Sequence, residues 1–184
     1  MAVKTFTNEQ LTASDTNTYL ANAGLVYITS ATPGSGASSV TVSNCFSSTY
    51  DAYKIIATGG GTAANGTMAF QFSGITSGYY IGIIYWAYSA GSGTPNIYSA
   101  ANQSTWQEVG STSANGLSLN MDVLNPNLAK MKSYSTPAPN MNTSGLFVYT
   151  NGICNSTSQA TGFTLSIGTT FTGGTITVYG YRKA

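Results

Sequence analysis

The residue types that most often carry catalysis are scarce in this chain. It has no histidine, which is the commonest general base and metal ligand. Its carboxylates are Glu9, Asp15, Asp51, Glu108 and Asp122. A glycosidase-type pair would need two of the last three within roughly 5 to 10 Å of each other, and nothing in their spacing indicates this. We expect these carboxylates to be solvated or to cap turns.

Other catalytic and metal-binding patterns are missing as well. No SxxK or GxSxG sequence provides an activated serine. The two cysteines, Cys45 and Cys154, are too few for a zinc site, and we expect buried thiols more readily than a disulfide. The glycine clusters at 34–36 and 59–61 do not open helices, so they are interpreted as turns rather than phosphate loops. The sequence predicts a protein that is not an enzyme and uses no cofactor or metal.

The remaining functional signal is a group of aromatic residues between positions 79 and 106. Aromatic rings beside amides and hydroxyls suit both subunit interfaces and sugar stacking, although core packing and cross-strand pairing are the favoured explanation for any single ring. For a subunit interface, the candidates in this part of the chain are Tyr79, Tyr85, Trp86 and Tyr88. For contact with a glycan, the candidates are Trp86, Tyr98 and Trp106.

The composition favours an assembled protein. Only 6% of the 184 residues are charged and the formal net charge is +1, so little repulsion keeps copies apart. A secreted β-domain kept soluble by hydroxyls and amides is the alternative. The six basic residues are scattered, which argues against nucleic-acid binding. The start of the chain lacks the apolar stretch of a signal peptide, and no run is long enough to span a membrane, so we expect neither secretory export nor a membrane partner.

Short alternating runs separated by turn residues predict an all-β fold. Apolar and polar residues alternate at 68–72, 117–123, 163–167 and 176–179, and further strands are expected at 25–29, 40–42, 53–58, 79–88, 106–109 and 146–150. This pattern predicts a single antiparallel β-sandwich of the jelly-roll type over residues 25–184. The segment 162–182 is interpreted as a closing hairpin linked at Gly173 and Gly174, and 128–134, with Lys130 and Lys132 on one face, as an exposed edge strand.

Residues 1–24 are predicted to be an arm that leads into a short helix. Ser14 and Asp15 are candidate N-caps, and Gly24 is a stop. The apolar residues of this segment are too few for a core of their own, so they must dock on this domain or on a neighbouring copy. They are Phe6, Leu11, Tyr19 and Leu20.

Three segments of the chain have a familiar pattern, namely TFTNEQLTASDTNTYLANAG, SNCFSSTYDAYKIIATG and GGTITVYGYRKA, which together cover about a third of its length. They resemble virion proteins of tailed bacteriophages, especially tail-fibre and minor tail proteins of marine and cyanobacterial phages. The resemblance implies a structural protein on the outside of the particle, usually a homotrimer, made in the host cytoplasm and released on lysis. Its partners would be further copies and capsid or tail proteins. No heptad or shaft repeat is present, which favours a compact decoration, cement or knob protein over a long fibre.

Two functions from different classes are therefore expected. The first is a structural virion component, attached through its N-terminal arm and its aromatic strands. The alternative is a receptor-binding module in which aromatic and amide side chains bind a host surface glycan.

Overall fold

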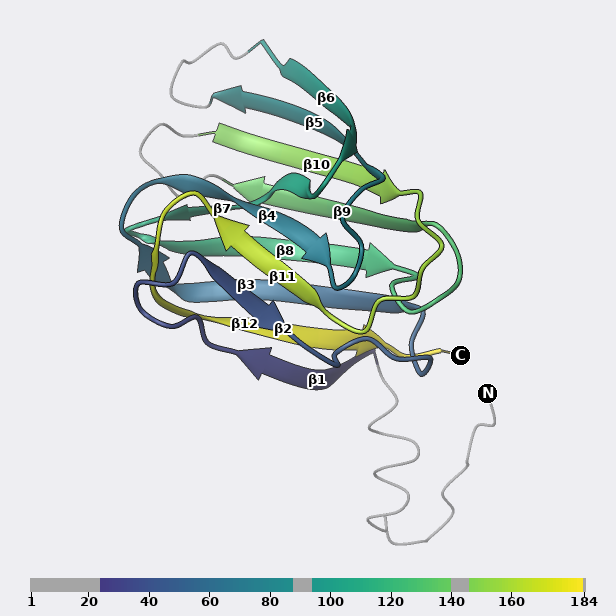
Figure 1. The fold of residues 1–184 in the computed structure, drawn as a ribbon. Coiled ribbons are helices and arrows are strands. Elements are labelled where there is room, and N and C mark those ends of the chain that lie inside the picture. Colours follow the sequence, from purple (N-terminus) through teal and green to yellow (C-terminus); the bar gives the residue numbers. More distant parts are fainter. Residues whose placement is uncertain (1–23, 88–93, 140–145, 184) are drawn as a thin grey trace, which may run out of the picture.

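A computed structural model describes residues 24–87, 94–139 and 146–183 of the chain. This part contains twelve strands and no helix, which confirms the prediction of an all-β fold. Figure 1 labels the strands in chain order. They are β1 (Leu25–Ala31), β2 (Ser39–Val42), β3 (Ala52–Thr62), β4 (Gly66–Phe72), β5 (Tyr79–Ala87), β6 (Asn96–Gln103), β7 (Trp106–Ser113), β8 (Gly116–Leu124), β9 (Lys132–Pro139), β10 (Leu146–Cys154), β11 (Phe163–Ile167) and β12 (Phe171–Tyr181).

Hydrogen bonding arranges the strands in two arrays, and every pairing is antiparallel. The eight-strand array has the order β1-β12-β3-β8-β9-β10-β5-β6. The four-strand array has the order β2-β11-β4-β7. Strand β8 joins them, because its first residues pair with β7 and its later residues pair with β3 and β9.

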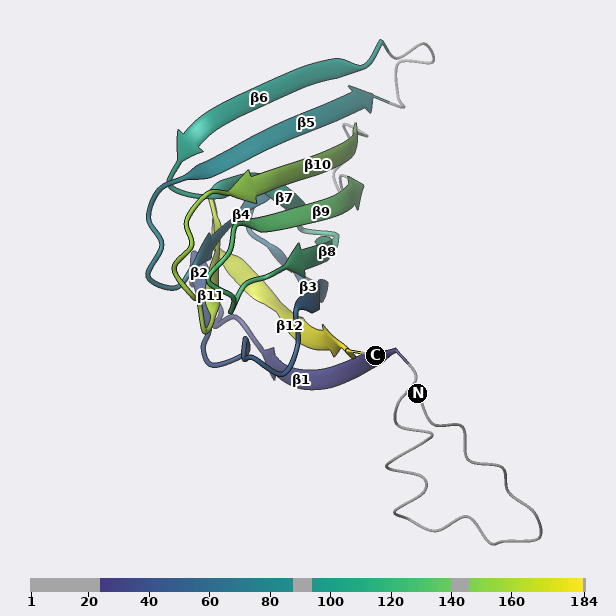
Figure 2. The same ribbon diagram turned by 90° about the vertical axis from the view of Figure 1, so that its right-hand side faces the viewer.

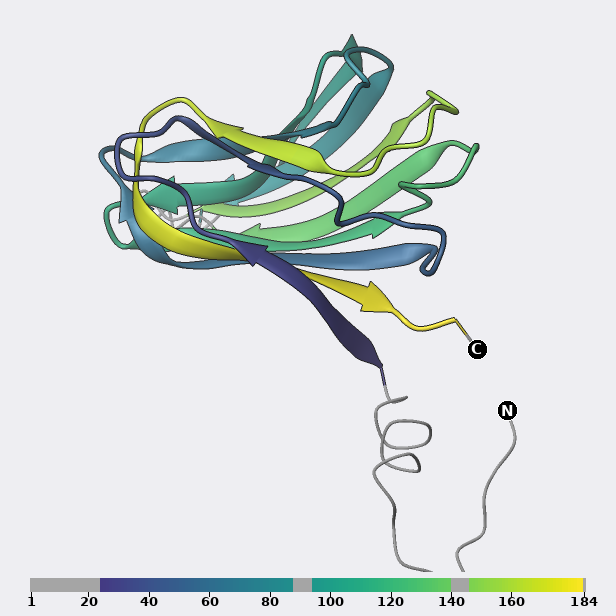
Figure 3. The same cartoon turned by 60° about the horizontal axis from the view of Figure 1, so that its bottom comes forward.

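The four-strand array lies over one face of the eight-strand array, as Figures 2 and 3 show. We call the covered face of the eight-strand array its inner face and the opposite face its outer face. Strands β1 and β6 form the two far edges of the larger array. Successive side chains of a strand point to opposite faces, so each strand of the larger array contributes to both.

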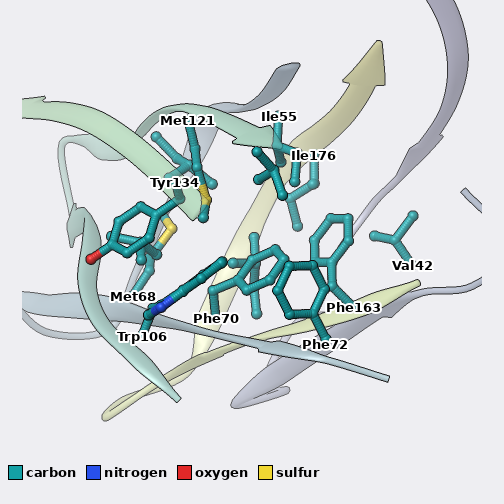
Figure 4. Close-up of a cluster of buried hydrophobic side chains, with 14 of the residues drawn as sticks. Val42, Ile55, Met68, Phe70, Phe72, Trp106, Met121, Tyr134, Phe163 and Ile176 are labelled. Atoms are coloured by element: carbon teal, nitrogen blue, oxygen red, sulfur yellow. The ribbon is translucent and has the colours of Figure 1, made fainter. Parts of the chain in front are cut away.

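The core lies between the two arrays (Figure 4). Phe70 of β4 stacks on Trp106 of β7 at a centroid distance of 5.5 Å and on Phe163 of β11 at 4.9 Å. Ile55 of β3 and Met121 of β8 are buried beside them from the larger array. The predicted alternation is confirmed in β11 and β12, whose apolar residues Phe163, Leu165, Ile167, Ile176 and Val178 are all buried.

The predicted closing hairpin is wrong, because β11 and β12 do not pair with each other. Strand β11 lies between β2 and β4, whereas β12 lies between β1 and β3. The chain crosses from one array to the other at residues 168–170. Gly173 and Gly174 belong to β12 itself, where both have positive φ and the register with β3 shifts. Gly174 has a φ of +113°, and a Cβ there would lie 3.2 Å from the backbone oxygen of Thr58, so this bulge requires glycine.

The predicted edge strand at 128–134 is also wrong. Strand β9 begins at Lys132 and lies between β8 and β10, in the interior of the larger array. Lys132 is buried, and its Nζ donates hydrogen bonds to the carbonyl oxygens of Lys130 at 3.1 Å and Ser156 at 3.0 Å. Two backbone carbonyls therefore replace the solvent that a lysine on an edge strand would have.

Two further predictions concern the thiols and the N-terminal segment. Cys45 and Cys154 are free and buried, as expected of small core residues. The predicted arm and helix of residues 1–23 lie outside the described residues, as do the arm residues Phe6, Leu11, Tyr19 and Leu20.

Candidate assembly surface

Strands β5 and β10 present Trp86, Phe147 and Tyr149 to the outer face of the larger array. Trp86 of β5 is opposite Phe147 of β10, with the two rings 5.6 Å apart at an interplanar angle of 33°. The next outward pair is Ile84 and Tyr149. All four side chains are exposed, at 37% to 44% of their surface. They form an apolar patch on a face that the rest of the described chain leaves uncovered.

The register extends this patch across four strands. Ile97 of β6 pairs with Ile84, and Pro137 of β9 pairs with Tyr149, so Ile97, Ile84, Tyr149 and Pro137 lie in one row. Ile97 is 80% exposed, more than any other large hydrophobic residue of the described part. We call the outer face of β6, β5, β10 and β9 the uncharged half. Residues 55–107 and 133–181 carry no Asp, Glu, Lys or Arg, so no charged side chain arises from it.

The outer face of β8, β3, β12 and β1 carries an ion pair, and we call it the paired-charge half. Lys54 Nζ lies 3.1 Å from Asp122 Oδ2, and the hydroxyl of Tyr181 donates to Asp122 Oδ1 at 2.6 Å. Burial and the neighbouring Asp122 raise the pKa of Tyr181 to about 12. Apolar side chains, including Leu25, Tyr27 and Leu124, are exposed around this network.

A shallow depression of about 410 Å³ lies on the outer face near the middle of β5 and β10. Gly82 opens it, since a Cβ at this position would meet no atom within 4 Å. Tyr80, Ser133, Asn151 and Ile153 surround it. An aromatic ring, an amide and a hydroxyl around an uncharged hollow can stack on and hydrogen-bond to a neutral polar ligand.

Two of the predicted contact residues belong to the core instead. Trp106 is fully buried, and its Nε1 donates to the carbonyl oxygen of Ile153 at 3.1 Å. Tyr79 is also fully buried, and its hydroxyl bonds to the backbone of Phe72 and Ile75. Neither side chain reaches the surface, so both assignments are corrected: Tyr79 is no interface residue and Trp106 no glycan contact of this chain.

The other predicted residues separate into two groups. Trp86 lies in the exposed patch. Tyr85 and Tyr98 point to the inner side of the array, where Tyr85 packs partly against the core and Tyr98 is 47% exposed. Tyr88 lies outside the described residues. Sequence reasoning missed Phe147, Tyr149 and Ile97. The run at 146–149, which was expected to be a strand, is apolar on both faces, whereas no strand was expected around Ile97.

The three carboxylates of the described part are not brought together as a catalytic pair. Asp122 is paired with Lys54, and Asp51 with Lys183 at 2.8 Å. Glu108 is half-buried on β7, and burial raises its pKa. The described residues contain no group of three or more His, Cys, Asp and Glu that could hold a metal ion. They also include no helix long and apolar enough to cross a membrane.

Comparison with known proteins gives little further information. No protein-family model matches the chain, and no curated protein matches it. A solved structure of the infectious bursal disease virus Gx strain aligns with 85% of this chain and 38% of that chain, at 14% identity and a TM-score of 0.13. A likeness this weak carries no argument about fold or function.

Proposed function

We propose that this protein is a non-enzymatic structural component on the exterior of a tailed-phage virion, of the capsid-decoration, cement or tail-fibre type. The uncharged half of the outer face is the observation that carries the proposal. Its exposed Trp86, Phe147, Ile84, Tyr149 and Ile97 would lose contact with water if a neighbouring subunit covered them. No charge there has to be desolvated, which lowers the cost of forming such a contact.

The finer architecture and the setting belong to the same proposal. We classify the two layered arrays as a β-sandwich of the jelly-roll type, which is the simplest description of four strands packed over eight. The phage setting is supported by the resemblance of residues 5–24, 43–59 and 173–184 to phage virion proteins. In this proposal the copies form a homotrimer, residues 1–24 attach it to capsid or tail proteins, and the protein leaves the host on lysis.

The decisive experiment measures the incorporation of this protein into virus particles. Deleting residues 1–24 should abolish incorporation, measured as copies per purified particle, while the remaining chain still gives a β-sheet circular dichroism spectrum. A matched pair of full-length variants refines the result. Serine at Phe6, Leu11, Tyr19 and Leu20 should have the same effect as the deletion, whereas serine at Thr7, Asn8, Thr16 and Asn17 should have none. Unchanged incorporation of the deletion variant would contradict the proposal.

A second function is favoured by the depression beside Gly82, namely recognition of a host surface glycan. Gly82→Val tests it, because a side chain at this position enters open space and the backbone there needs no positive φ. The variant should fold normally and fill the depression. If glycan recognition is the function, host-cell adsorption falls at least tenfold while the number of copies per particle stays unchanged. Normal adsorption of such particles excludes the depression as a glycan site.

A further inference from the structure

Strand β6 is an edge strand, and the outward backbone groups of its segment Asn96–Ala100 have no partner in the described part of the chain, whereas the carbonyl of Ala101 further along accepts from Gln103 Nε2. It pairs only with β5 there, so half of its N–H and C=O groups point away from the array. Such an edge accepts another strand unless a structural device prevents this. The usual devices are a short strand, a bulge, a proline or a charged side chain.

The other free edges of the described part carry these devices, and the first half of β6 does not. Strand β2 has only four residues, and β1 is interrupted by a register shift between Tyr27 and Thr29. The segment Asn96–Ala100 of β6 pairs with β5 without interruption, and the shift in this pair comes later, near Gln103. Pro95 stands before the strand, and no proline or charged residue lies within it.

We propose that β6 binds the β6 of a second copy in an antiparallel, two-fold symmetric pair centred on Tyr98. Tyr98 is the midpoint of the uninterrupted segment, so a two-fold axis through it pairs Tyr98 with its own equivalent and Ile97 with Ser99 of the other copy. Tyr98 is 47% exposed, so its ring is available for this cross-strand contact.

An identical copy fits this edge better than a charged partner does. No charged side chain arises from β5, β6, β10 or the part of β9 that follows Lys132, so like copies do not repel each other here. The pairing also continues the row of Pro137, Tyr149, Ile84 and Ile97 beyond the edge of one subunit. Ile97, exposed at 80% in a single copy, would then be flanked by a strand on each side.

The contact is expected to be weak in isolation. A five-residue edge buries less than the roughly 800 Å² per partner that is typical of stable complexes. In a particle, many such contacts would act together and their avidity would exceed the affinity of one. The inference rests on the proposed oligomeric function, in which other surfaces hold the trimer and β6 joins copies in pairs.

Disulfide trapping in the full-length protein tests both the surface and the register. Opposed residues of an antiparallel pair have Cα atoms about 4.5 to 5.5 Å apart, within the range that a disulfide spans. The two native thiols are buried and should not interfere. Under mild oxidation, Tyr98→Cys should therefore form a dimer of twice the 19.1 kDa chain mass at least tenfold faster than Tyr27→Cys, a matched variant on the opposite edge strand.

The register gives a second, independent readout. A mixture of Ile97→Cys and Ser99→Cys chains should form the mixed dimer faster than either variant forms a dimer with itself. Equal rates for Tyr98→Cys and Tyr27→Cys would overturn the inference, and fast trapping of Tyr98→Cys without the mixed preference would overturn the register.

A particle assay separates this inference from the proposed function. Ile97→Lys places like charges at the pair, so its occupancy on particles should fall, whereas Met131→Lys, on an exposed residue away from β6, should keep normal occupancy. Normal occupancy of Ile97→Lys, still dependent on residues 1–24, would reject the β6 contact and leave the structural role intact. Loss of that dependence on residues 1–24 would instead reject the structural role.

Discussion

The interior between the arrays and the outer face of the larger array are built from the same kinds of residue. Trp106, Phe70 and Phe163 are fully buried in the interior. Trp86 and Phe147 are exposed on the outer face, although they also stack on each other. Residue type therefore does not distinguish core from contact surface in this chain. The covering array makes the difference, and it covers one face only.

The charged groups of the two regions also have different partners and different exposure to water. On the outer face, Lys54 and Asp122 form an ion pair at partly exposed positions, where water screens their charges. On the interior side, Lys132 is fully buried, and its Nζ donates to two backbone carbonyls. A buried ammonium of this kind is held by backbone dipoles rather than by an opposite charge, and burial lowers its pKa.

The largest expected effect concerns Trp106. Trp106→Ala removes a fully buried ring that contacts Phe70, Phe72, Tyr79 and Tyr134, together with its hydrogen bond to β10. The free energy of unfolding should fall by about 3 to 5 kcal/mol, as measured by urea denaturation. Trp106→Phe, which keeps most of the ring volume, is the control and should lose less. A loss below about 1 kcal/mol for Trp106→Ala would contradict its place in the core.

The next effect is a pH dependence that Lys132 contributes. Burial lowers the pKa of Lys132 from its ordinary value of 10.5. The folded state therefore binds fewer protons than the unfolded state between the lowered pKa and 10.5, and this group's contribution to stability rises with pH across that window. The slope for one proton is at most about 1.4 kcal/mol per pH unit.

Comparison with Lys132→Met isolates this contribution together with the electrostatic interaction between Lys132 and the thiol of Cys154. Urea denaturation from pH 7 to 10.5 should show the wild type gaining stability relative to the variant as pH rises. Lys130→Met, at an exposed neighbouring position, should show no such change. A pH-independent difference between the wild type and Lys132→Met would contradict the assignment.

A smaller effect is expected for the ion pair of the outer face. Asp122→Ala leaves Lys54 without its partner and the Tyr181 hydroxyl without its acceptor. We expect a loss of about 1 to 2 kcal/mol, mainly from the hydrogen bond, because the carboxylate is partly exposed. The pKa of Tyr181, followed by NMR of labelled tyrosine, should fall from about 12, since the negative charge that raises it is gone. A Tyr181 pKa that stays at its raised value would show that burial alone sets it.

The sequence predicted the local pattern of the fold better than its pairing. Period-two alternation located most strands because a half-buried strand needs it. It could not show that β11 and β12 belong to different arrays, since their partners β2, β4, β1 and β3 are remote in sequence. Strand β6 was missed because an exposed edge needs little apolar alternation. No strand was expected over 135–139, which contains Pro137 and Pro139, although pairing with β10 holds these residues as the second half of β9.

The candidate surface was predicted only in part, because the sequence does not show which face of the larger array is covered. Trp86 and Trp106 are both amphipathic rings beside polar residues, and only the covering array separates them. Gly152 is one position that the packing around Trp106 requires to be small. A Cβ there would clash with the backbone oxygen of Tyr80 and would lie 2.6 Å from the ring of Tyr134 and 3.2 Å from Trp106 Nε1, so a glycine 46 residues away in sequence leaves room for the packing around Trp106.

The smallest effect on folding should come from Trp86, and it is the one that links the outer face to assembly. Trp86→Ala removes a half-exposed ring and its cross-strand contact with Phe147, so the free energy of unfolding should fall by less than about 1 kcal/mol. Occupancy on particles should nevertheless fall severalfold, because aromatic residues dominate the binding energy of interfaces. Tyr27→Ala, which removes an aromatic ring from the paired-charge half, is the control and should leave occupancy unchanged. If both variants retain full occupancy, the uncharged half is an exposed surface of the assembled particle rather than a contact within it.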